Sequence, residues 1–466
     1  ITLTVAAKLV YKKGTVENMQ PTRALDPQTG LYKAITGAAK YLLQQLDCKS
    51  QRARTKYEYY DADNDITDFG ISVPKKMMNS KPGIGWASRA VNTLSDRLNF
   101  DGFAGDESGI NDLFERIGAS PVINAARHDS IIAGCAFIAI ADDGGGKKLI
   151  PFTALEATGV IDENTGLLSM GLAVTRWSLP NPRKRNYLAV PVDYILFLPE
   201  FTAVFEDDTL CDIKENPTKR CLLHPITRKR SANAPLGRSK LTKSARRIIQ
   251  EVARVKRRYE IASEFYSTPQ RYINGLAQGA EKDNNLDSAL GKVWAITKDD
   301  DGDKPDIGQL AQMSIDQFSG QKKDLARDFC AETSLTLRNL GYETANPTSA
   351  DSLTAMSDDL LLEAKSLQRE MGEQIKQLAI TLRMSIDGID TVPDKLKKIV
   401  PAWSLIFQVD LGAAGDAVYK LFQAMPELIG TVQSYQMLGI SVREAEQLQK
   451  IRQSSINSQF MQGGAK

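Results

Sequence analysis

Apolar residues recur at helical spacing in three segments of the first third of the chain. The segment 30–46 places them on one helix face: Leu31, Ala34, Ile35, Ala38, Leu42, Leu43 and Leu46. The segment 86–98 has the same spacing, and 121–140 begins with a helical pattern and passes into a continuous apolar run. Because side chains three or four residues apart share a helix face, we predict helices in the first two segments and at the beginning of the third.

A different pattern follows the turn at residues 144–146. Short runs rich in β-branched and aromatic residues alternate with turn residues, which is typical of β-strands. These runs are Leu149–Phe152, Gly171–Trp177, Tyr187–Val190 and Tyr194–Leu198. The pattern therefore predicts a mixed α/β unit over the first 225 residues.

Helical periodicity returns after Pro235. One apolar stripe runs from Leu241 to Tyr266, and Pro269 ends it because proline lacks the backbone donor that a helix needs. Residues 270–312 are rich in Gly and Asp, so we predict a small β insertion with strands at Arg271–Asn274 and Lys292–Thr297. A second helix is expected from Ser314 to Leu337.

The polar loop Asn339–Pro347 separates this helix from a longer one. Thr348 and Asp351 resemble a capping box, and the helical pattern then continues to about Met384. Further along we expect a strand at Pro401–Val409, helices over Asp416–Gln453, and a mobile tail after Ser454.

Composition indicates a soluble globular chain of about three structural units, since it has 466 residues, of which 42% are apolar and 25% charged. Its longest uncharged apolar run, Ser130–Ala141, has 12 residues. A membrane span needs about 20, so we expect no membrane segment, and the N-terminus lacks the pattern of a secretory signal. The five cysteines are scattered and odd in number, which favours reduced thiols in a cytosolic setting: Cys48, Cys135, Cys211, Cys221 and Cys330.

A net charge of +2 hides a strong asymmetry. Residues 214–258 contain 15 Lys or Arg against two acids, so the rest of the chain is acidic. A concentrated basic block points to a polyanionic partner. A solvated helix face or a protein interface is the alternative, and composition leaves both open.

Catalytic signatures are missing from the sequence. It has no GxxxxGK[ST] motif, and the calcium-loop pattern that begins at Asp61 fails at Ile66 and Ser72. The only histidines are His128 and His224, which we interpret as structural. We therefore expect neither an enzyme nor a bound metal or cofactor.

Four groups of residues, taken in chain order, carry a family resemblance. Tyr59-Tyr60-Asp61, Lys81-Pro82-Gly83 and Phe100-Asp101-Gly102-Phe103 flank the helix at 86–98. Gly237-Arg238-Ser239 opens the basic helix, EFYSTPQRYING at residues 264–275 closes it, and NPTSAD at 346–351 starts the long helix. Together, from about Tyr41 to Leu448, they resemble the portal proteins of long-tailed bacteriophages.

The resemblance implies an α+β, predominantly helical portal fold that assembles as a ring, usually a dodecamer, around a DNA channel. The implied parts are an N-terminal arm (1–30), an α/β wing (31–235), a first stem helix (236–268), a β-containing clip (269–313), a second stem helix (314–338), a tunnel loop (339–347), a long helix with the return strand of the wing (348–410), and a helical crown with a mobile tail (411–466).

The resemblance also suggests functional residues. In the tunnel loop, neutral and low-affinity DNA contacts would come from Asn339, Tyr342, Thr344 and Asn346, while Glu343 would repel phosphate. The basic face of the stem would comprise Lys243, Arg246, Arg247, Arg254, Arg257, Lys323, Arg327 and Arg338. We expect the acidic flank, Asp324, Asp328 and Glu332, to pair across subunits with Arg247, Arg254 or Arg258. In the clip, Asp299, Asp300, Asp301 and Asp303 should face a partner, because four carboxylates cannot be buried unpaired.

The implied partners are other copies of the chain, double-stranded DNA bound without sequence preference, the terminase large subunit, the head-completion adaptor, and the major capsid and scaffold proteins, with no membrane. The alternative is a monomeric nucleic-acid-binding protein that uses the basic helix 240–258 as its recognition element. An enzyme acting on nucleic acid is a third and more remote possibility, because catalytic motifs are missing.

Overall fold

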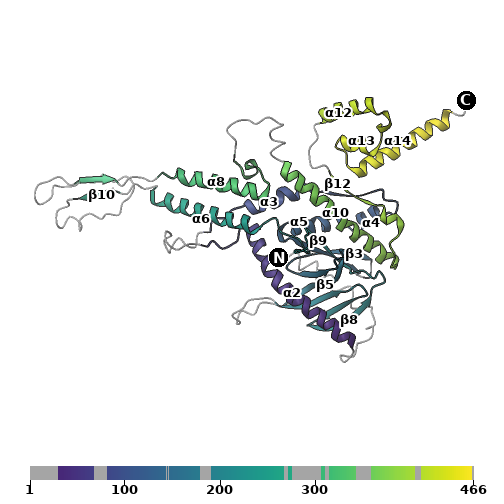
Figure 1. Ribbon diagram of the computed structural model, residues 1–466, viewed down its shortest axis with the longest axis horizontal. Helices are drawn as coiled ribbons and strands as arrows, with labels where there is room; N and C mark the ends of the chain where they lie inside the picture. The colour runs from purple at the N-terminus through teal and green to yellow at the C-terminus, as the bar shows by residue number, and fades with distance from the viewer. Residues whose placement is uncertain are drawn as a thin grey trace, which may run out of the picture.

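The computed structural model describes residues 30–67, 81–142, 144, 146–178, 190–266, 271–274, 306–309, 314–342, 358–404 and 411–463. Figure 1 shows an elongated molecule with three parts. These are a body of helices and sheets, a pair of long helices that projects from the body, and a small helical unit near the C-terminus. The fold mixes helices and strands and is predominantly helical, as the sequence predicted.

The body is built around one large apolar core. Buried side chains of α3, α5 and α10 meet there with those of the inner ends of the projecting helices. The helix α10 contributes a stripe at helical spacing that includes Leu367, Met371, Ile375 and Leu378. The helices of the body are α3 (Trp86–Ser95), α4 (Ile110–Arg116), α5 (Ala119–Ala133), α10 (Asp358–Asp387) and α11 (Asp394–Lys397).

Two antiparallel sheets lie against each other in the body. The three-stranded sheet has the order β3-β2-β9, and the five-stranded sheet has the order β4-β5-β6-β7-β8. Phe137 lies opposite Phe152 on one side and Pro225 on the other. The strands are β2 (Cys135–Asp142), β3 (Lys147–Thr153), β4 (Ala157–Ile161), β5 (Leu168–Trp177), β6 (Pro191–Phe197), β7 (Phe201–Glu206), β8 (Thr209–Glu215) and β9 (Leu223–Thr227).

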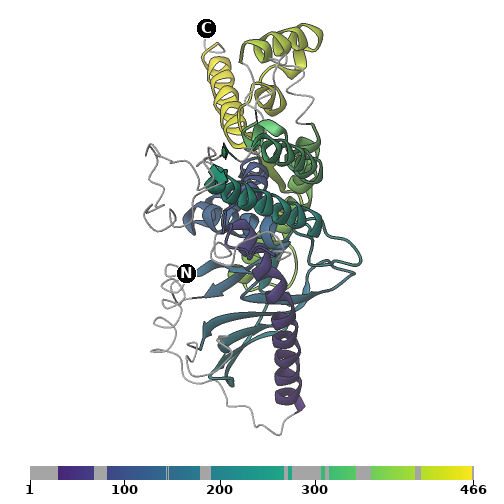
Figure 2. The ribbon, with the colours of Figure 1, turned by 90° about the vertical axis from the view of Figure 1, so that its left-hand side faces the viewer.

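The helix α2 (Gly30–Tyr60) covers the outer face of the five-stranded sheet. Figure 2 shows it running along the sheet at the end of the molecule opposite the C-terminal unit. We predicted this helix only to Leu46. It continues because Ala53 and Tyr59 extend its buried face toward the body.

The projecting pair consists of α6 (Lys243–Tyr266) and α8 (Asp316–Thr333), and the antiparallel strands β10 (Arg271–Asn274) and β11 (Asp306–Gln309) lie at its outer end. At the inner end Trp86 and Phe329 are in ring contact, 5.5 Å apart. The second helix ends earlier than predicted because Ser334 adopts a left-handed backbone with φ of 54°. The predicted strand at 271–274 is confirmed, whereas the one at 292–297 lies outside the described residues.

After α8 the chain forms the short 3-10 helix η2 (Leu337–Leu340). The strand β12 (Val400–Trp403) pairs antiparallel with β1 (Phe100–Ala104), and residues 405–409 of the predicted strand 401–409 lie outside the described residues. The C-terminal unit contains α12 (Leu411–Ala424), η3 (Pro426–Leu428), α13 (Val432–Met437) and α14 (Val442–Gly463). The last helix extends past Ser454, where we had expected a mobile tail.

Candidate functional site

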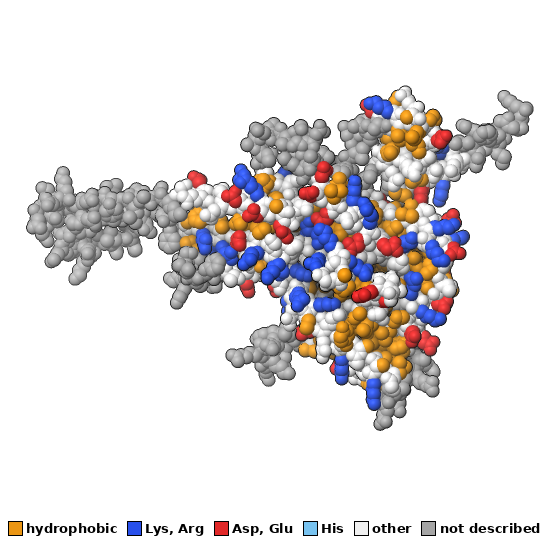
Figure 3. All heavy atoms as spheres, viewed as in Figure 1, with side chains coloured by type: hydrophobic (Ala, Val, Ile, Leu, Met, Phe, Trp, Pro, Cys, Tyr) orange, Lys and Arg blue, Asp and Glu red, His pale blue; other side chains and the backbone are white. Residues whose placement is uncertain are grey.

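The projecting helix pair carries most of the predicted functional residues. Figure 3 shows Lys and Arg side chains following the length of α6. Lys243 and Arg247 are exposed there. Arg246 is half-buried, with its guanidinium 5.8 Å from the centre of the Tyr59 ring. Lys243, Arg246 and Arg247 are spaced so that they lie on one side of the helix, but Arg246 is less exposed to solvent than the other two.

Two predicted members of the basic face are engaged within the chain. Arg257 is only 3% exposed, so its predicted place on the surface is wrong. Its position on α6 falls on the side that packs into the molecule, and long side chains can be buried along their apolar stems. Arg254 is half-buried and donates from Nη1 to the Thr67 carbonyl oxygen over 3.3 Å.

The second helix presents charges of both signs. Lys323, Arg327 and Asp328 are exposed on α8. Arg327 pairs with Asp324 one turn away, with 2.8 Å between Nη1 and Oδ1. Glu332 accepts a hydrogen bond from the Thr242 hydroxyl over 2.5 Å. Within the acidic flank, therefore, Asp324 and Glu332 already have partners in their own chain.

A cleft of about 380 Å³ runs between the two helices. Its walls mix both charges with apolar side chains: Glu251, Arg254, Val255 and Arg258 on α6, and Gln321, Asp324 and Leu325 on α8. Asp324 of the acidic flank and two of the predicted basic partners, Arg254 and Arg258, thus line one cleft of a single chain. The remaining candidates for pairing between chains are Asp328 and Arg247, both of which are exposed.

The predicted loop begins inside the folded body. Asn339 belongs to η2, where its backbone N–H donates to the Thr336 hydroxyl and its side-chain oxygen accepts from the Thr336 N–H. Tyr342 packs against the main core together with Leu337 and Leu340. We expected the loop to have no apolar side chains that hold it to the core. Leu340 and Tyr342, which lie in the predicted loop, do so. Arg338 is exposed, while Glu343, Thr344 and Asn346 lie outside the described residues.

The acidic turn Asp299, Asp300, Asp301 and Asp303 also lies outside the described residues. Among the described residues, no cluster of His, Cys, Asp or Glu has an arrangement that could hold a metal ion. No described helix is both long enough and apolar enough to cross a membrane. All five cysteines carry free thiols, as predicted.

Both histidines are built into the body. His128 lies 3.2 Å from the Ser95 hydroxyl and 3.1 Å from the Tyr60 hydroxyl, so its two ring nitrogens join α5 to α3 and α2. His224 is fully enclosed in β9, where burial lowers the pKa of its imidazole to about 3. A neutral, enclosed imidazole suits the structural role that the sequence suggested.

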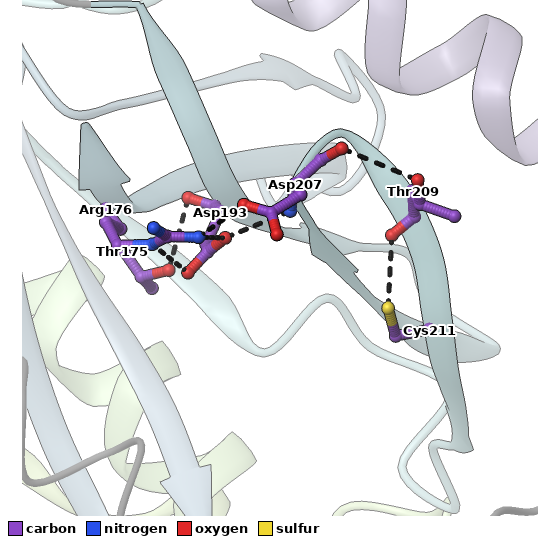
Figure 4. Close-up of polar contacts among 6 residues, drawn as sticks. All are labelled: Thr175, Arg176, Asp193, Asp207, Thr209 and Cys211. Atoms are coloured by element: carbon purple, nitrogen blue, oxygen red, sulfur yellow. Dashed lines mark hydrogen bonds and ion pairs between the residues drawn. The ribbon is translucent and has the colours of Figure 1, made fainter. Parts of the chain in front are cut away.

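Sequence patterns gave no sign of an ionic cluster on the five-stranded sheet (Figure 4). Arg176 on β5 forms a bidentate pair with Asp193 on β6, at 2.6 and 2.7 Å, and its Nη2 also lies 2.6 Å from Asp207. Asp193 is buried and also accepts the backbone N–H of Asp207. The cluster fixes the β7–β8 turn to its neighbouring strands, which is a structural role.

Part of the basic block faces inward. Lys240, which we had assigned to the basic helix, precedes α6 and is buried against Glu363 of α10, 2.5 Å away. Arg228 and Lys229 contact the same carboxylate, and Lys219 pairs with Asp390 at 2.9 Å. Arg228, Lys229 and Lys240 therefore hold α10 in place through Glu363 instead of meeting an external polyanion.

Comparison with known proteins agrees with the resemblance seen in the sequence. No protein-family model matches the chain. The portal protein of Mycobacterium phage L5 is 21% identical over 429 residues, which cover 88% of this chain and 86% of that protein. The portal protein of Mycobacterium phage D29 is 21% identical over 435 residues, which cover 88% of this chain and 87% of that protein. The resemblance to portal proteins is thereby confirmed over most of the chain.

Solved structures of gene transfer agent particles are also similar. The neck of the native particle, computed with C12 symmetry, has 12% identity and a TM-score of 0.42, over 79% of this chain and 93% of the other. The neck of the empty particle, computed with C6 symmetry, has 13% identity and a TM-score of 0.44, over 76% and 90%. At TM-scores below 0.5 these likenesses are too distant to carry a structural argument.

Proposed function

We infer that this chain is a portal protein, the subunit of a ring at one vertex of a bacteriophage capsid. The observation that carries the inference is the similarity to two mycobacteriophage portal proteins over 88% of the chain. The projecting pair α6–α8 supports it, since the resemblance implies a stem of two such helices with a β-containing clip between them. The protein would belong to the virion and assemble in the host cytoplasm.

The ring, most simply a dodecamer, would surround double-stranded DNA during packaging and ejection. DNA must slide, so its contacts with the wall have to be weak and independent of sequence. Lys243, Arg247, Lys323 and Arg338 are exposed on or beside the helix pair, and a ring would repeat each of them in every copy. The exposed carboxylates of α8 would limit sticking by repelling phosphate.

Contacts between copies would use the acidic flank of α8. Asp328 is exposed, whereas Asp324 and Glu332 have partners in their own chain. We propose that Asp328 of one copy pairs with an exposed basic residue of α6, such as Arg247, in the next. An exposed pair is worth only about 0–1 kcal/mol, but a closed ring repeats it at every interface.

Other partners follow from the implied parts of a portal. The clip, with its Asp299–Asp303 turn, would bind the terminase large subunit during packaging and the head-completion adaptor afterwards. The wing and the C-terminal unit would face the major capsid and scaffold proteins. Within the tunnel loop, Thr344 and Asn346 remain the proposed DNA contacts and Glu343 would repel phosphate, since Asn339 and Tyr342 are held by the body.

The alternative of a monomeric nucleic-acid-binding protein loses support from the structure. A recognition helix needs one free basic face to enter a groove. Here Arg257 is buried, Arg246 and Arg254 are half-buried, and Lys240 pairs with Glu363. The helix α6 also packs along α8, which covers one of its sides.

Location in the particle tests the proposal. An affinity tag on the C-terminus of the chain, detected by gold labelling of intact virions and of virions opened at the tail, should mark a single vertex, the one that carries the tail. Label on many vertices would contradict a portal. So would label that is found only on tagged protein outside the particles and never on the particles themselves. A tagged major capsid protein, labelled all over the shell, serves as the control.

A further inference from the structure

A buried ionic cluster joins two segments that are distant in sequence. Glu363, in the second turn of α10, lies 2.5 Å from the Lys240 ammonium through Oε2 and contacts the Arg228 guanidinium through Oε1. All three side chains are at most 6% exposed. Burial would raise the pKa of the Glu363 carboxyl, but Lys240, Arg228 and Lys229 outweigh it and lower that pKa to about 2. These cations therefore favour the charged form of the carboxylate.

The same face of α10 also holds the backbone of the connection between β9 and α6. Glu370 accepts the N–H groups of Lys229 and Arg230, at 3.0 and 2.8 Å. Gln374 accepts the N–H of Thr227 at 2.8 Å and donates to its hydroxyl at 2.7 Å. Glu363, Glu370 and Gln374 are seven and four residues apart, so they lie on one side of the helix.

The connection itself is fixed to the body on its other side. The Arg228 N–H donates to the Gly134 carbonyl oxygen at 3.0 Å, and the Lys240 N–H donates to that of Ile131 at 2.9 Å. Gly237 has φ of +77°, and a Cβ there would lie 2.5 Å from the carbonyl oxygens of Arg228 and Gly134. Only a glycine at position 237 lets the backbone lie this close to the carbonyl oxygens of Arg228 and Gly134. The helix α6 begins six residues after Gly237.

Stability alone does not account for a buried cluster of this kind. Well-packed apolar side chains usually stabilise a core as much as a buried ion pair does, because removing charges from water costs free energy. A carboxylate held between two cations adds something else, because it permits only one position of α10 relative to the connection. Sliding α10 along the connection would leave buried charges unpaired, and that penalty is large.

We propose that Glu363 locks the start of α10 to the start of α6, so that a displacement of the α6–α8 pair moves α10 as part of the same rigid unit. The inference about the lock stands on the contacts of one chain. Its consequence rests on the proposed function: in a portal ring, a partner bound at the outer end of the helix pair would shift α10, and with it the core of the body.

Distance measurements on the full-length chain test the lock. Ser244 and Ser366 are exposed on α6 and α10, so each can be replaced by cysteine, with the five native cysteines removed, and carry a nitroxide label. In the parent, electron–electron double resonance should give one narrow distance distribution. The variant Arg228→Met, Lys240→Met, Glu363→Met keeps the side-chain volume without the charges and should broaden it at least about twofold.

Glu373→Gln, an exposed residue on the same helix, is the matched control and should leave the distribution unchanged. A methionine variant that folds and shows the parental width would overturn the lock. The labelled monomer suffices for this comparison. Failure to form rings would therefore count against the portal proposal and leave the lock standing.

A second measurement needs no variant. Native-state hydrogen exchange of the parent should give the hydrogen-bonded amides of Arg228 and Lys240 and those of residues 363–367 protection factors within about threefold of one another, as one cooperative unit. Protection factors that are about a hundredfold lower in one segment than in the other would contradict a rigid unit. This result decides the matter if the methionine variant does not fold.

Discussion

Arg89 donates its Nε proton to the main-chain carbonyl oxygen of Asn339, over 2.8 Å. Arg89 belongs to α3 and Asn339 to η2, so the bond ties two elements of the main core that are 250 residues apart in sequence. Leu337, Leu340 and Tyr342 pack against the same core. The first residues after α8 are therefore part of the body, and the proposed DNA contacts begin only after Tyr342.

The first prediction concerns the hydroxyl of Tyr342. Its oxygen is buried and has no hydrogen-bond partner among the described residues, and burial raises the pKa of this phenol. Because an unsatisfied buried hydroxyl is unfavourable, Tyr342→Phe should leave the free energy of unfolding unchanged or raise it by up to about 1 kcal/mol. Tyr342→Ala should lower it by about 2 kcal/mol, because the ring contacts are lost.

Urea unfolding followed by circular dichroism checks this prediction. Tyr259→Phe, at a tyrosine that is 43% exposed, is the control and should change the free energy of unfolding by less than about 0.5 kcal/mol. A loss of more than about 1 kcal/mol in Tyr342→Phe would show that the hydroxyl has a partner and that Tyr342 is placed differently.

The second prediction concerns pH. Burial raises the pKa of the Asp129 carboxyl to about 6, against its ordinary value of 3.8, although the Tyr57 hydroxyl donates to it at 3.2 Å. Between these two values the folded state binds more protons than the unfolded state. The contribution of Asp129 to stability therefore falls as the pH rises from about 4 to 6.

Asp129→Asn removes this titration. At pH 3 the variant and the parent should be about equally stable, since the Asp129 carboxyl is then mostly protonated in both the folded and the unfolded state. At pH 7 the variant should be the more stable, by at most about 3 kcal/mol, because each pKa unit corresponds to about 1.4 kcal/mol. Urea unfolding at the two pH values measures the difference. A difference that is the same at both would contradict a raised pKa.

The third prediction concerns contacts between copies. Asp328→Lys should weaken ring assembly, because it places a cation where the next copy is proposed to present one, and Arg247→Glu in the same chain should restore it. Native mass spectrometry at low and high salt measures the fraction of rings. Glu163→Lys, an exposed reversal far from the helix pair, is the control. If the double variant assembles no better than Asp328→Lys alone, these two residues are not partners.

Helices with a long one-sided apolar stripe could be predicted from the sequence. The stripe from Leu241 through Val252 is buried in the core, as its spacing indicated, and the helix α6 ends shortly before Pro269. Helical faces are local patterns, so residues four apart report on one another directly. The strands β3, β5 and β6 were found for the same reason, because their apolar runs are several residues long.

Other strands could not be predicted because their signals are ambiguous. The strand β9 contains Pro225, which argues against a strand in the middle of a sheet. It is tolerated because β9 lies at the edge of the order β3-β2-β9 and can pair on one side only. For the strands β4, β7 and β8, nothing in their own residues indicates which neighbours complete their sheet.

The candidate site shows a different limit of sequence analysis. Lys240 and Arg257 were assigned to a basic surface because neighbouring residues are basic, but the fold buries both. The partner of Lys240 is Glu363, 123 residues away, and no local pattern reports on a contact at that separation. Charge along a sequence predicts a polyanion-binding surface only when tertiary structure leaves that charge free.

Ring formation tests the central claim most directly. We predict that class averages of the purified full-length chain in the electron microscope, or of the chain recovered from capsids if it purifies as a monomer, show closed rings with an open axial channel. We expect the ring to have twelve copies. Particles that stay monomeric in every condition, together with capsids that assemble and fill with DNA normally when the chain is absent, would contradict the assignment as a portal.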